Sequence, residues 1–400
     1  MSADGQRLNE CPLCGSRQLR WLDEFAVSVS SDSRSGCGVV HNAVCSDCGV
    51  VFNASGTRFN LSEFYSERYQ LLSESTLAEF VYKAENAVTT KGINDQMIDA
   101  VFDQIKPNRV GRMLEVGCGK GLFLRKFKDR FPDWEVCAIE PSRNAQSFLS
   151  RMVPEARAEF CSFQDSRFAS EQFDLVVSIG VLEHVPDPVG FCRSLRQCLK
   201  PNGACFISVP NFEENPSDLI TFDHLTRFTP WTLNAVIARA EMTVKSIHAS
   251  KIVPMWAIAV AANFPTQKPH KDPRGDEVAR AASRWMRGAF ETYDQMALAS
   301  PRHASVALYG TGIVGLAAPD NCRLSVDSIS CFVEDNVHLH GAERLGRPII
   351  SLDALRSDDR VTELSFSANP CYLKQMEVRA RAVLGDKVRI WSLPDLKEVE

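Results

Sequence analysis

The sequence lacks the features that mark nucleic-acid-binding, membrane and secreted proteins. Its 45 Lys and Arg residues are outnumbered by 50 Asp and Glu residues, so the net charge is −5 and no excess of positive charge indicates binding to nucleic acid or anionic lipid. No uninterrupted apolar run reaches the roughly 18 residues that a membrane-spanning helix requires. The first ten residues contain no apolar signal core. Short repeats and low-complexity tracts are also absent. We therefore expect a soluble globular protein.

What the chain does contain is an ordinary globular composition. Hydrophobic residues make up 44% and charged residues 24% of its 400 residues, which is typical of proteins with an apolar core. This length predicts two or three domains.

Fourteen cysteines are present, and ten of them are scattered, mostly within apolar runs: Cys37, Cys118, Cys137, Cys161, Cys192, Cys198, Cys205, Cys322, Cys331 and Cys371. Cysteine in such runs usually behaves as a small buried hydrophobe. We therefore expect a reducing, cytoplasmic setting rather than a disulfide framework.

The other four cysteines form two Cys-x-x-Cys-Gly knuckles, Cys11/Cys14 and Cys45/Cys48. Two residues between thiolates let both sulfurs reach one tetrahedral ion, so two knuckles predict a closed, structural zinc site. The 30 residues between the knuckles exceed the roughly 15–20 of common zinc ribbons, and short strands at 25–30 and 38–41 would fill them. Cys37 or His41 could replace one ligand. A thioredoxin-like redox pair is a weaker alternative, because it does not explain two copies.

A glycine-rich turn follows an apolar strand in the middle of the chain. Glu115 is followed by Gly117, Gly119 and Gly121, and Glu140 ends the next apolar run, 19 residues after Gly121. Glycines at this spacing let the backbone approach a flat ligand closely. A carboxylate at the end of the next strand is where such a sheet holds ribose hydroxyls. The motif resembles the S-adenosylmethionine loop of class I methyltransferases.

The resemblance extends over residues 110–261. A buried strand ends near Ile179 and is followed by Glu183 and His184, and Leu199-Lys-Pro-Asn-Gly203 then leads into another buried strand. The resemblance implies a Rossmann-like α/β core. It implies that the glycine turn and Glu115 hold the methionine part of the cofactor, that Glu140 holds the ribose, and that Phe163 and Gln164 flank the adenine, with Asp165 as a further contact. His184 is either catalytic or a structural histidine.

The polar loop at 211–229 contains Asp223-His224, the strongest acid/base candidate of the chain. Histidine titrates near neutral pH, and a neighbouring carboxylate can orient it. Thr229 and Pro230 are suited to begin a helix directly after this loop. A methyl acceptor must be deprotonated, so we expect His224, with Asp223, to act as a general base, although His224 could simply brace the loop.

These patterns predict five segments: a zinc ribbon at 1–60, a helical connector or cofactor lid at 61–106, an S-adenosylmethionine-binding methyltransferase domain at 107–262, a linker and helix at 263–300, and a Rossmann-like α/β domain at 301–400. The connector contains aromatic residues that could cover the cofactor but at helical spacing are more often core: Phe64, Tyr65, Tyr69, Phe80 and Tyr82.

The C-terminal segment opens with Gly310, Gly312 and Gly315 after a strand, followed by the acids Glu334 and Asp335. This spacing matches a dinucleotide-binding turn, but Pro319 allows only a very short helix after it. Binding of a substrate nucleotide, a purely structural role and binding of a nicotinamide cofactor all remain open.

The order of zinc knuckles, methyltransferase core and second α/β unit resembles the sugar-nucleotide C-methyltransferases of deoxysugar biosynthesis. In that family a Tyr-x-Glu-His segment carries the base; here Thr221-Phe-Asp223-His224 occupies its place. The resemblance implies a nucleotide-linked sugar as substrate. O- or N-methylation of another small metabolite, a zinc-ribbon RNA methyltransferase and a binding module without catalysis are the alternatives. The sequence does not predict an oligomeric state.

Overall fold

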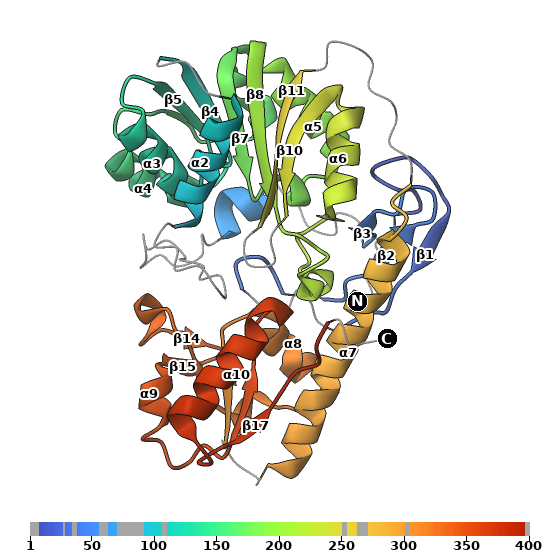
Figure 1. Cartoon of the computed structure of the whole chain (residues 1–400), viewed down its shortest axis with the longest axis vertical. Coiled ribbons are helices and arrows are strands. Elements are labelled where there is room, and N and C mark those ends of the chain that lie inside the picture. The colour runs from blue at the N-terminus through green and yellow to red at the C-terminus, as the bar shows by residue number, and fades with distance from the viewer. Residues whose placement is uncertain are drawn as a thin grey trace.

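The computed structural model describes residues 8–26, 29–33, 38–55, 63–69, 92–105, 110–249, 254–261, 271–300 and 305–396. These residues form three β-sheets, one from the N-terminal segment, one central and one C-terminal. Figure 1 shows the central and C-terminal sheets one above the other, with the N-terminal strands and the long helix α7 (Gly275–Ala299) along one side. Phe80, Tyr82 and Cys37 lie outside the described residues.

The N-terminal sheet takes its last strand from the segment at 107–262. Its antiparallel order is β1 (Leu19–Trp21), β2 (Asn42–Cys45), β3 (Val51–Asn53) and β9 (Thr226–Arg227). Of the short strands predicted at 25–30 and 38–41, residues 27 and 28 lie outside the described residues, and the rest does not form a regular strand. In the described residues the chain makes only single bridges there, Phe25 with Val40 and Val29 with Thr221. The regular strand β2 begins at Asn42, directly after the second predicted segment, and pairs with β1 and β3.

The central sheet has seven strands in the order β10-β11-β8-β7-β4-β5-β6. Their bounds are β4 (Arg112–Val116), β5 (Glu135–Ile139), β6 (Arg157–Glu159), β7 (Phe173–Ile179), β8 (Leu199–Val209), β10 (Met242–His248) and β11 (Met255–Ala261). Strands β4 to β8 are mutually parallel, whereas β11 is antiparallel to both of its neighbours. Apolar runs in the sequence predict strands at 112–116, 135–140, 158–162, 173–179, 204–209 and 243–250, and each of these ranges overlaps a strand of the sheet. Only β11 is not predicted, because its continuous apolar run has no alternation to distinguish it from a buried helix.

Helices cover both faces of the central sheet. They are α2 (Ile93–Ile105), α3 (Leu122–Arg130), α4 (Gln146–Met152), α5 (Pro188–Gln197) and α6 (Pro230–Arg239). Met113 packs with α2, α3 and α4, whereas its neighbour Leu114 packs with α5 and α6, as alternating strand residues do. Thr229 caps α6 through a reciprocal bond with Thr232, which confirms the predicted start of that helix.

Four short helical turns carry polar residues near the carboxyl ends of the parallel strands. They are η1 (Phe64–Arg68), η3 (Phe163–Asp165), η5 (Leu182–His184) and η6 (Pro216–Ile220). The remaining short turns are η2 (Arg143–Ala145), η4 (Arg167–Ser170), η7 (Val326–Ser328) and η8 (Val337–Leu339). No helix among the described residues has the length and hydropathy needed to cross a membrane.

The C-terminal sheet has the order β14-β15-β13-β12-β16-β17, parallel except at β14. Its elements are β12 (Val306–Tyr309), α8 (Ile313–Asn321), β13 (Ile329–Val333), β14 (Glu343–Arg344), β15 (Arg347–Ile350), α9 (Leu352–Leu355), β16 (Glu363–Phe366), α10 (Pro370–Leu384) and β17 (Arg389–Trp391). Helix α8 continues past Pro319, so the expected early break does not occur. The hydrogen bond that proline cannot donate is one of the last in the helix.

One apolar core joins the N-terminal module, α7 and the C-terminal sheet. Phe25 and Val51 belong to the same buried cluster as Trp285 of α7 and Leu308 of β12. The indole of Trp285 also donates a hydrogen bond to the Pro394 carbonyl at 2.8 Å. Helix α7 therefore ties the first and last parts of the chain together.

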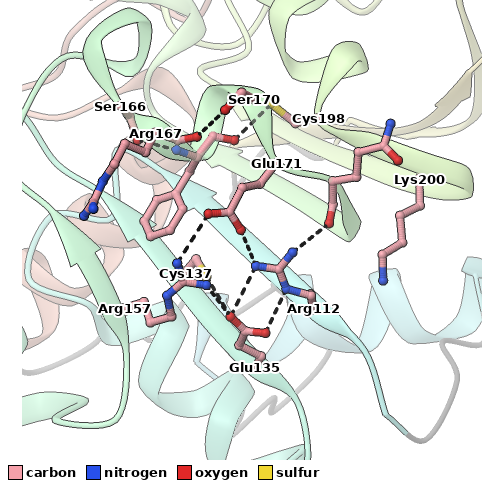
Figure 2. A network of polar contacts seen from close by, with 12 residues as sticks. Arg112, Glu135, Cys137, Arg157, Ser166, Arg167, Ser170, Glu171, Cys198 and Lys200 are labelled. Carbon is pink, nitrogen blue, oxygen red and sulfur yellow. Dashed lines mark hydrogen bonds and ion pairs between the residues drawn. The ribbon is translucent and has the colours of Figure 1, made fainter.

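A network of ion pairs lies at the end of the central sheet opposite to the glycine turn (Figure 2). Arg112 of β4 contacts Glu135 of β5 at 2.8 Å and Glu171 at 2.5 Å, and Arg157 of β6 reaches Glu135 at 2.8 Å. Hydrogen bonds from Arg112 and Arg157 lower the pKa of Glu135 to about 2. These residues join the first positions of three parallel strands, and they lie away from the strand ends that bind ligands in such sheets.

The two knuckle glycines give a matched test of how the N-terminal module packs on α7. Gly49 has φ +82°, and a Cβ there would lie 2.7 Å from Cβ of Asp272, just before α7; Gly15 has φ +72° with open space around it. We expect Gly15→Ala to lower the free energy of unfolding by about 1 kcal/mol through backbone strain. Gly49→Ala should cost about 1–3 kcal/mol more, because it also overpacks the interface. Denaturant unfolding measures both variants; equal losses would contradict the packing argument.

Candidate functional site

The turn between β4 and α3 requires glycine for two reasons. Gly117 and Gly119 have φ values of +77° and +52°, a region that other residues rarely adopt. A Cβ on Gly117 would also lie 2.3 Å from Cγ2 of Val181. The backbone amide of Gly117 donates to the Ile139 carbonyl at 2.7 Å, which fixes the turn against the end of β5.

This turn lies over a cavity of about 1050 Å³ at the carboxyl ends of the parallel strands. Seven of the predicted cofactor residues line it: Glu115, Gly117, Gly119, Glu140, Phe163, Gln164 and Asp165. Gly121 is not among the lining residues. It has φ +82°, and a Cβ there would lie 2.4 Å from Cδ1 of Leu149 in α4. Backbone conformation and packing against α4 therefore explain this glycine.

Two buried acids face the cavity with different hydrogen bonding. Glu140 accepts bonds from the amides of Gly119 and Ser142, both at 2.8 Å. Glu115 is 3% exposed, and its Oε2 has no hydrogen-bond partner among the described residues. Burial, together with the charge of Glu140, raises the pKa of Glu115 well above its usual range. A ligand with positive charge would satisfy both the charge and the unpaired oxygen.

His184 lies on the wall of the same cavity, beside two tyrosines that the sequence pattern had favoured as core residues. Tyr65 and Tyr69, on and just after η1, line the cavity as well. The Tyr65 hydroxyl is 2.7 Å from Nδ1 of His184 and 3.1 Å from Oδ2 of Asp223. The backbone carbonyl of Asp223 is 2.9 Å from the same His184 nitrogen. Nδ1 of His184 is therefore fully occupied, and Nε2 lies 3.8 Å from Oε1 of Glu183.

The expected pairing of Asp223 with His224 does not occur. Nδ1 of His224 is hydrogen-bonded to Oδ1 of Asp218 instead, because adjacent residues on this extended loop direct their side chains to different neighbours. Burial alone would lower the pKa of His224, but the Asp218 carboxylate raises it to about 9. His224 is thus an imidazolium at neutral pH. Its ring centroid lies 4.7 Å from that of His184, so the two candidate histidines do come together.

A fully buried arginine holds this loop in shape. The Arg227 guanidinium donates to the backbone carbonyls of Asp218, Thr221 and His224. Sequence reasoning did not identify Arg227 or Asp218 as parts of the site. Asp218 stands six residues before His224, a separation with no periodic signature in an irregular loop. Only the local excess of polar residues could have drawn attention to it.

The four knuckle cysteines form one cluster. Sγ of Cys11 lies 3.5 Å from that of Cys48, Sγ of Cys14 lies 3.5 Å from that of Cys45, and all four sulfurs lie within 4.8 Å of one another. Four sulfurs at a zinc–sulfur distance of about 2.3 Å would be separated by roughly 3.8 Å in a tetrahedron, so the cluster fits such an ion. His41 lies outside it and is bonded to Glu24 at 2.8 Å.

The C-terminal glycines pack against protein rather than bordering open space. A Cβ on Gly310 or Gly312 would lie 2.4 Å from the Ser367 carbonyl oxygen, and a Cβ on Gly315 would lie 2.3 Å from Oγ of Ser367. Glu334 accepts a hydrogen bond from the Thr311 hydroxyl at 3.0 Å. Close packing on the loop after β16 therefore explains these glycines without a ligand.

Comparison with known proteins places the central segment in a family. A family model described as a methyltransferase domain matches residues 92–246. Ubiquinone biosynthesis O-methyltransferase from Histophilus somni (strain 2336) is 32% identical over 108 residues, covering 25% of this chain and 45% of that protein. The mitochondrial enzyme of the same name from Arabidopsis thaliana is 26% identical over 160 residues, covering 36% and 50%. The chain thus spans at most half the length of these curated relatives.

Among solved structures, the 1,6-didemethyltoxoflavin-N1-methyltransferase of Burkholderia thailandensis, with S-adenosylhomocysteine bound, aligns over 42% of this chain and 78% of its own. Its TM-score is 0.35 at 16% identity. Residues 92–246, which hold the glycine turn and the parallel strands of the central sheet, are thus similar to methyltransferase domains.

Proposed function

We propose that this protein is an S-adenosylmethionine-dependent methyltransferase that acts on a small molecule. The observation that carries the proposal is a single cavity of about 1050 Å³. The glycine turn, two buried acids and His184 all line it. Donor-binding residues and an acid–base group therefore border a single space.

The residues around the cavity suit a cationic nucleoside. The donor supplies an electrophilic methyl group on a positively charged sulfonium. Glu115 provides an unpaired buried oxygen for the ammonium of its methionine part. Glu140 is fixed by two backbone amides and retains lone pairs for ribose hydroxyls. Phe163 and Gln164 would flank the adenine.

We assign the base to His184 rather than to His224. Asp218 keeps His224 protonated at neutral pH, so His224 cannot accept a proton there. Its positive charge would instead stabilise negative charge that develops on the acceptor. His184 borders the cavity, and with Nδ1 bonded to Tyr65 and the Asp223 carbonyl, its Nε2 can take a proton from the acceptor.

The acceptor that we propose is a nucleotide-linked sugar, methylated at carbon, as the order of the three segments suggests. The tyrosine expected at Thr221 is missing, and Thr221 is fully buried, but Tyr65 supplies a tyrosine hydroxyl to the same cluster. O-methylation is the second candidate, because the curated relatives are named as O-methyltransferases. The C-terminal unit would hold the nucleotide.

We also propose that the N-terminal segment is a structural zinc module with Cys11, Cys14, Cys45 and Cys48 as ligands. Four buried or half-buried sulfurs at tetrahedral spacing support it. All four positions would be filled by protein, so the ion would stabilise the fold without contacting substrate. We further propose that the chain divides into its five segments after residues 60, 106, 262 and 300.

Glu115→Gln tests the donor site. We expect the variant to bind S-adenosylmethionine about 10- to 100-fold more weakly, because a charge-assisted hydrogen bond is lost. The ligand-free variant should nevertheless be more stable, because a buried acid with a raised pKa destabilises the fold once it ionises. Wild-type affinity should rise with pH as Glu115 loses its proton, whereas the variant's should not. Calorimetric titration across pH measures this. Glu135→Gln, at the opposite end of the sheet, is the matched control and should bind normally.

Methyl transfer tests the acceptor and the two histidines. Labelled donor incubated with nucleotide-sugar and phenolic acceptors, followed by mass spectrometry, should give a C-methylated sugar nucleotide. His184→Asn should lower kcat by about 10²–10⁴ through loss of the base. The rate should fall as pH rises through about 9, where His224 loses its proton, and this limb should move to lower pH in Asp218→Asn.

His248→Asn is the control for these histidine variants, because His248 stacks on Trp256 at the outer strand pair. It should retain full activity. Transfer to a phenolic hydroxyl alone would favour O-methylation, and wild-type protein that binds the donor but methylates no acceptor would refute the enzymatic proposal.

Metal analysis tests the cysteine cluster. The purified protein should contain one zinc per chain, and Cys48→Ser should lose both the metal and stability, since the binding energy of a structural zinc is folding energy. Cys322→Ser, with its thiol bonded to the Ala318 carbonyl, should keep its zinc. A metal-free wild-type protein of unchanged stability would disprove the assignment.

A further inference from the structure

The segment between the two cysteine knuckles lies against the loop that carries the catalytic candidates. The Val29 amide donates to the Ile220 carbonyl at 2.9 Å, and the Phe222 amide donates back to the Val29 carbonyl at 3.0 Å. Together these bonds form a parallel bridge between Val29 and Thr221. Residues 29–33 therefore lie alongside the loop at 211–229, although they are almost 200 residues away in sequence.

Further bonds from the same module hold the loop on its other sides. The side-chain amide of Asn42 donates to the Leu219 carbonyl and that of Asn53 to the Phe222 carbonyl, each at 2.7 Å. Strand β3 pairs with β9 near the end of the loop. Much of the loop's backbone is thus satisfied by the N-terminal module.

Ser31 makes the contact that matters chemically. Its amide donates to Oδ1 of Asp223 at 2.8 Å and its hydroxyl donates to Oδ2 at 2.5 Å. Asp223 is completely buried, and a buried carboxylate needs such donors to remain ionised. One residue of the N-terminal module therefore engages both oxygens.

From Asp223 the hydrogen bonds continue to the cavity wall. Oδ2 accepts from the Tyr65 hydroxyl, and the Tyr65 oxygen in turn faces Nδ1 of His184. All of these bonds are satisfied together if Tyr65 donates to Asp223 and Nδ1 of His184 carries its proton. That arrangement leaves Nε2 unprotonated, as a base requires.

We propose that Ser31 is a positioning residue of the active site: by fixing the Asp223 carboxylate it orients Tyr65, and through Tyr65 it sets the tautomer and the ring orientation of His184. The N-terminal cysteine module is then part of the catalytic unit rather than an appendage. This inference rests on the proposed role of His184 as the base.

The charge state of Asp223 reports the link. Burial raises its pKa, whereas the positive charge of His224 and the two bonds from Ser31 lower it, and the pKa lies below the usual value. The titratable and charged groups that face Asp223 from the surrounding elements are Tyr65, Tyr69, Glu183, His184, His224 and Arg227. Apart from these, the donors to Asp223 come from Ser31. The Ser31 hydroxyl also bonds Tyr69, so Ser31→Ala removes two contacts but no charge.

The test compares Ser31→Ala with Ser31→Thr, which restores a hydroxyl. Carboxyl-¹³C NMR of aspartate-labelled protein should show Asp223 titrating about one pH unit higher in Ser31→Ala. The ¹⁵N ring signals of His184 should lose the fixed Nδ1–H tautomer. With the acceptor found in the transfer assay, kcat should fall about 10- to 100-fold while affinity for S-adenosylmethionine stays unchanged. Ser31→Thr should recover most of each property.

Ser16→Ala is the matched control, because Ser16 lies in the same module but bonds Asp47 at 2.6 Å; it should change none of these properties. Unchanged Asp223 and His184 signals in Ser31→Ala would overturn the inference. Because both NMR signals are read without an acceptor, a wild-type protein that transfers no methyl group but shows the expected shifts would overturn the proposed function and support the positional link.

Discussion

Asp218 and Asp223 are carboxylates with almost no exposure on one irregular loop, and each must be compensated by cations and hydrogen-bond donors because burial of an unpaired charge is costly. Asp218 is compensated by the imidazolium of His224. Asp223 is compensated by Ser31, Tyr65 and the nearby histidines. The donors come from three distant parts of the chain. The loop can therefore hold its charges only when the N-terminal module and η1 are docked on the methyltransferase domain.

The two histidines acquire different chemistry from these neighbours. Both rings are fixed through Nδ1, but His224 meets a carboxylate whereas His184 meets a hydroxyl and a backbone carbonyl. A carboxylate favours the charged ring and neutral acceptors do so much less. In the proposed mechanism His224 is a cation at neutral pH, and His184, whose ring centroid lies 4.7 Å away, is the proton acceptor. The division of roles follows from which partner the loop presents, not from residue type.

In the part of the cavity proposed to bind the methyl donor, the two acids differ in hydrogen bonding. Glu140 is satisfied by backbone amides, whereas Glu115 is left with an unpaired oxygen under burial. A site that is strained electrostatically when empty gains most from a cationic ligand, so part of the cost of burying Glu115 returns as affinity and selectivity. The charged cluster at the far end of the sheet has no such imbalance, because Arg112 and Arg157 match Glu135 and Glu171.

Local and periodic features could be predicted from the amino-acid order. They include six of the seven central strands, the glycine turn, seven cofactor candidates that line the cavity, the four clustered cysteines and the start of α6 at Thr229. These depend on neighbours in sequence, or on strand ends that a parallel sheet must bring together. Three features depend on how distant segments fold together: Asp218 rather than Asp223 binds His224, Tyr65 and Ser31 reach the site, and the C-terminal glycines pack on Ser367. Such contacts join irregular segments far apart in the chain, where no periodicity records which side chains will meet.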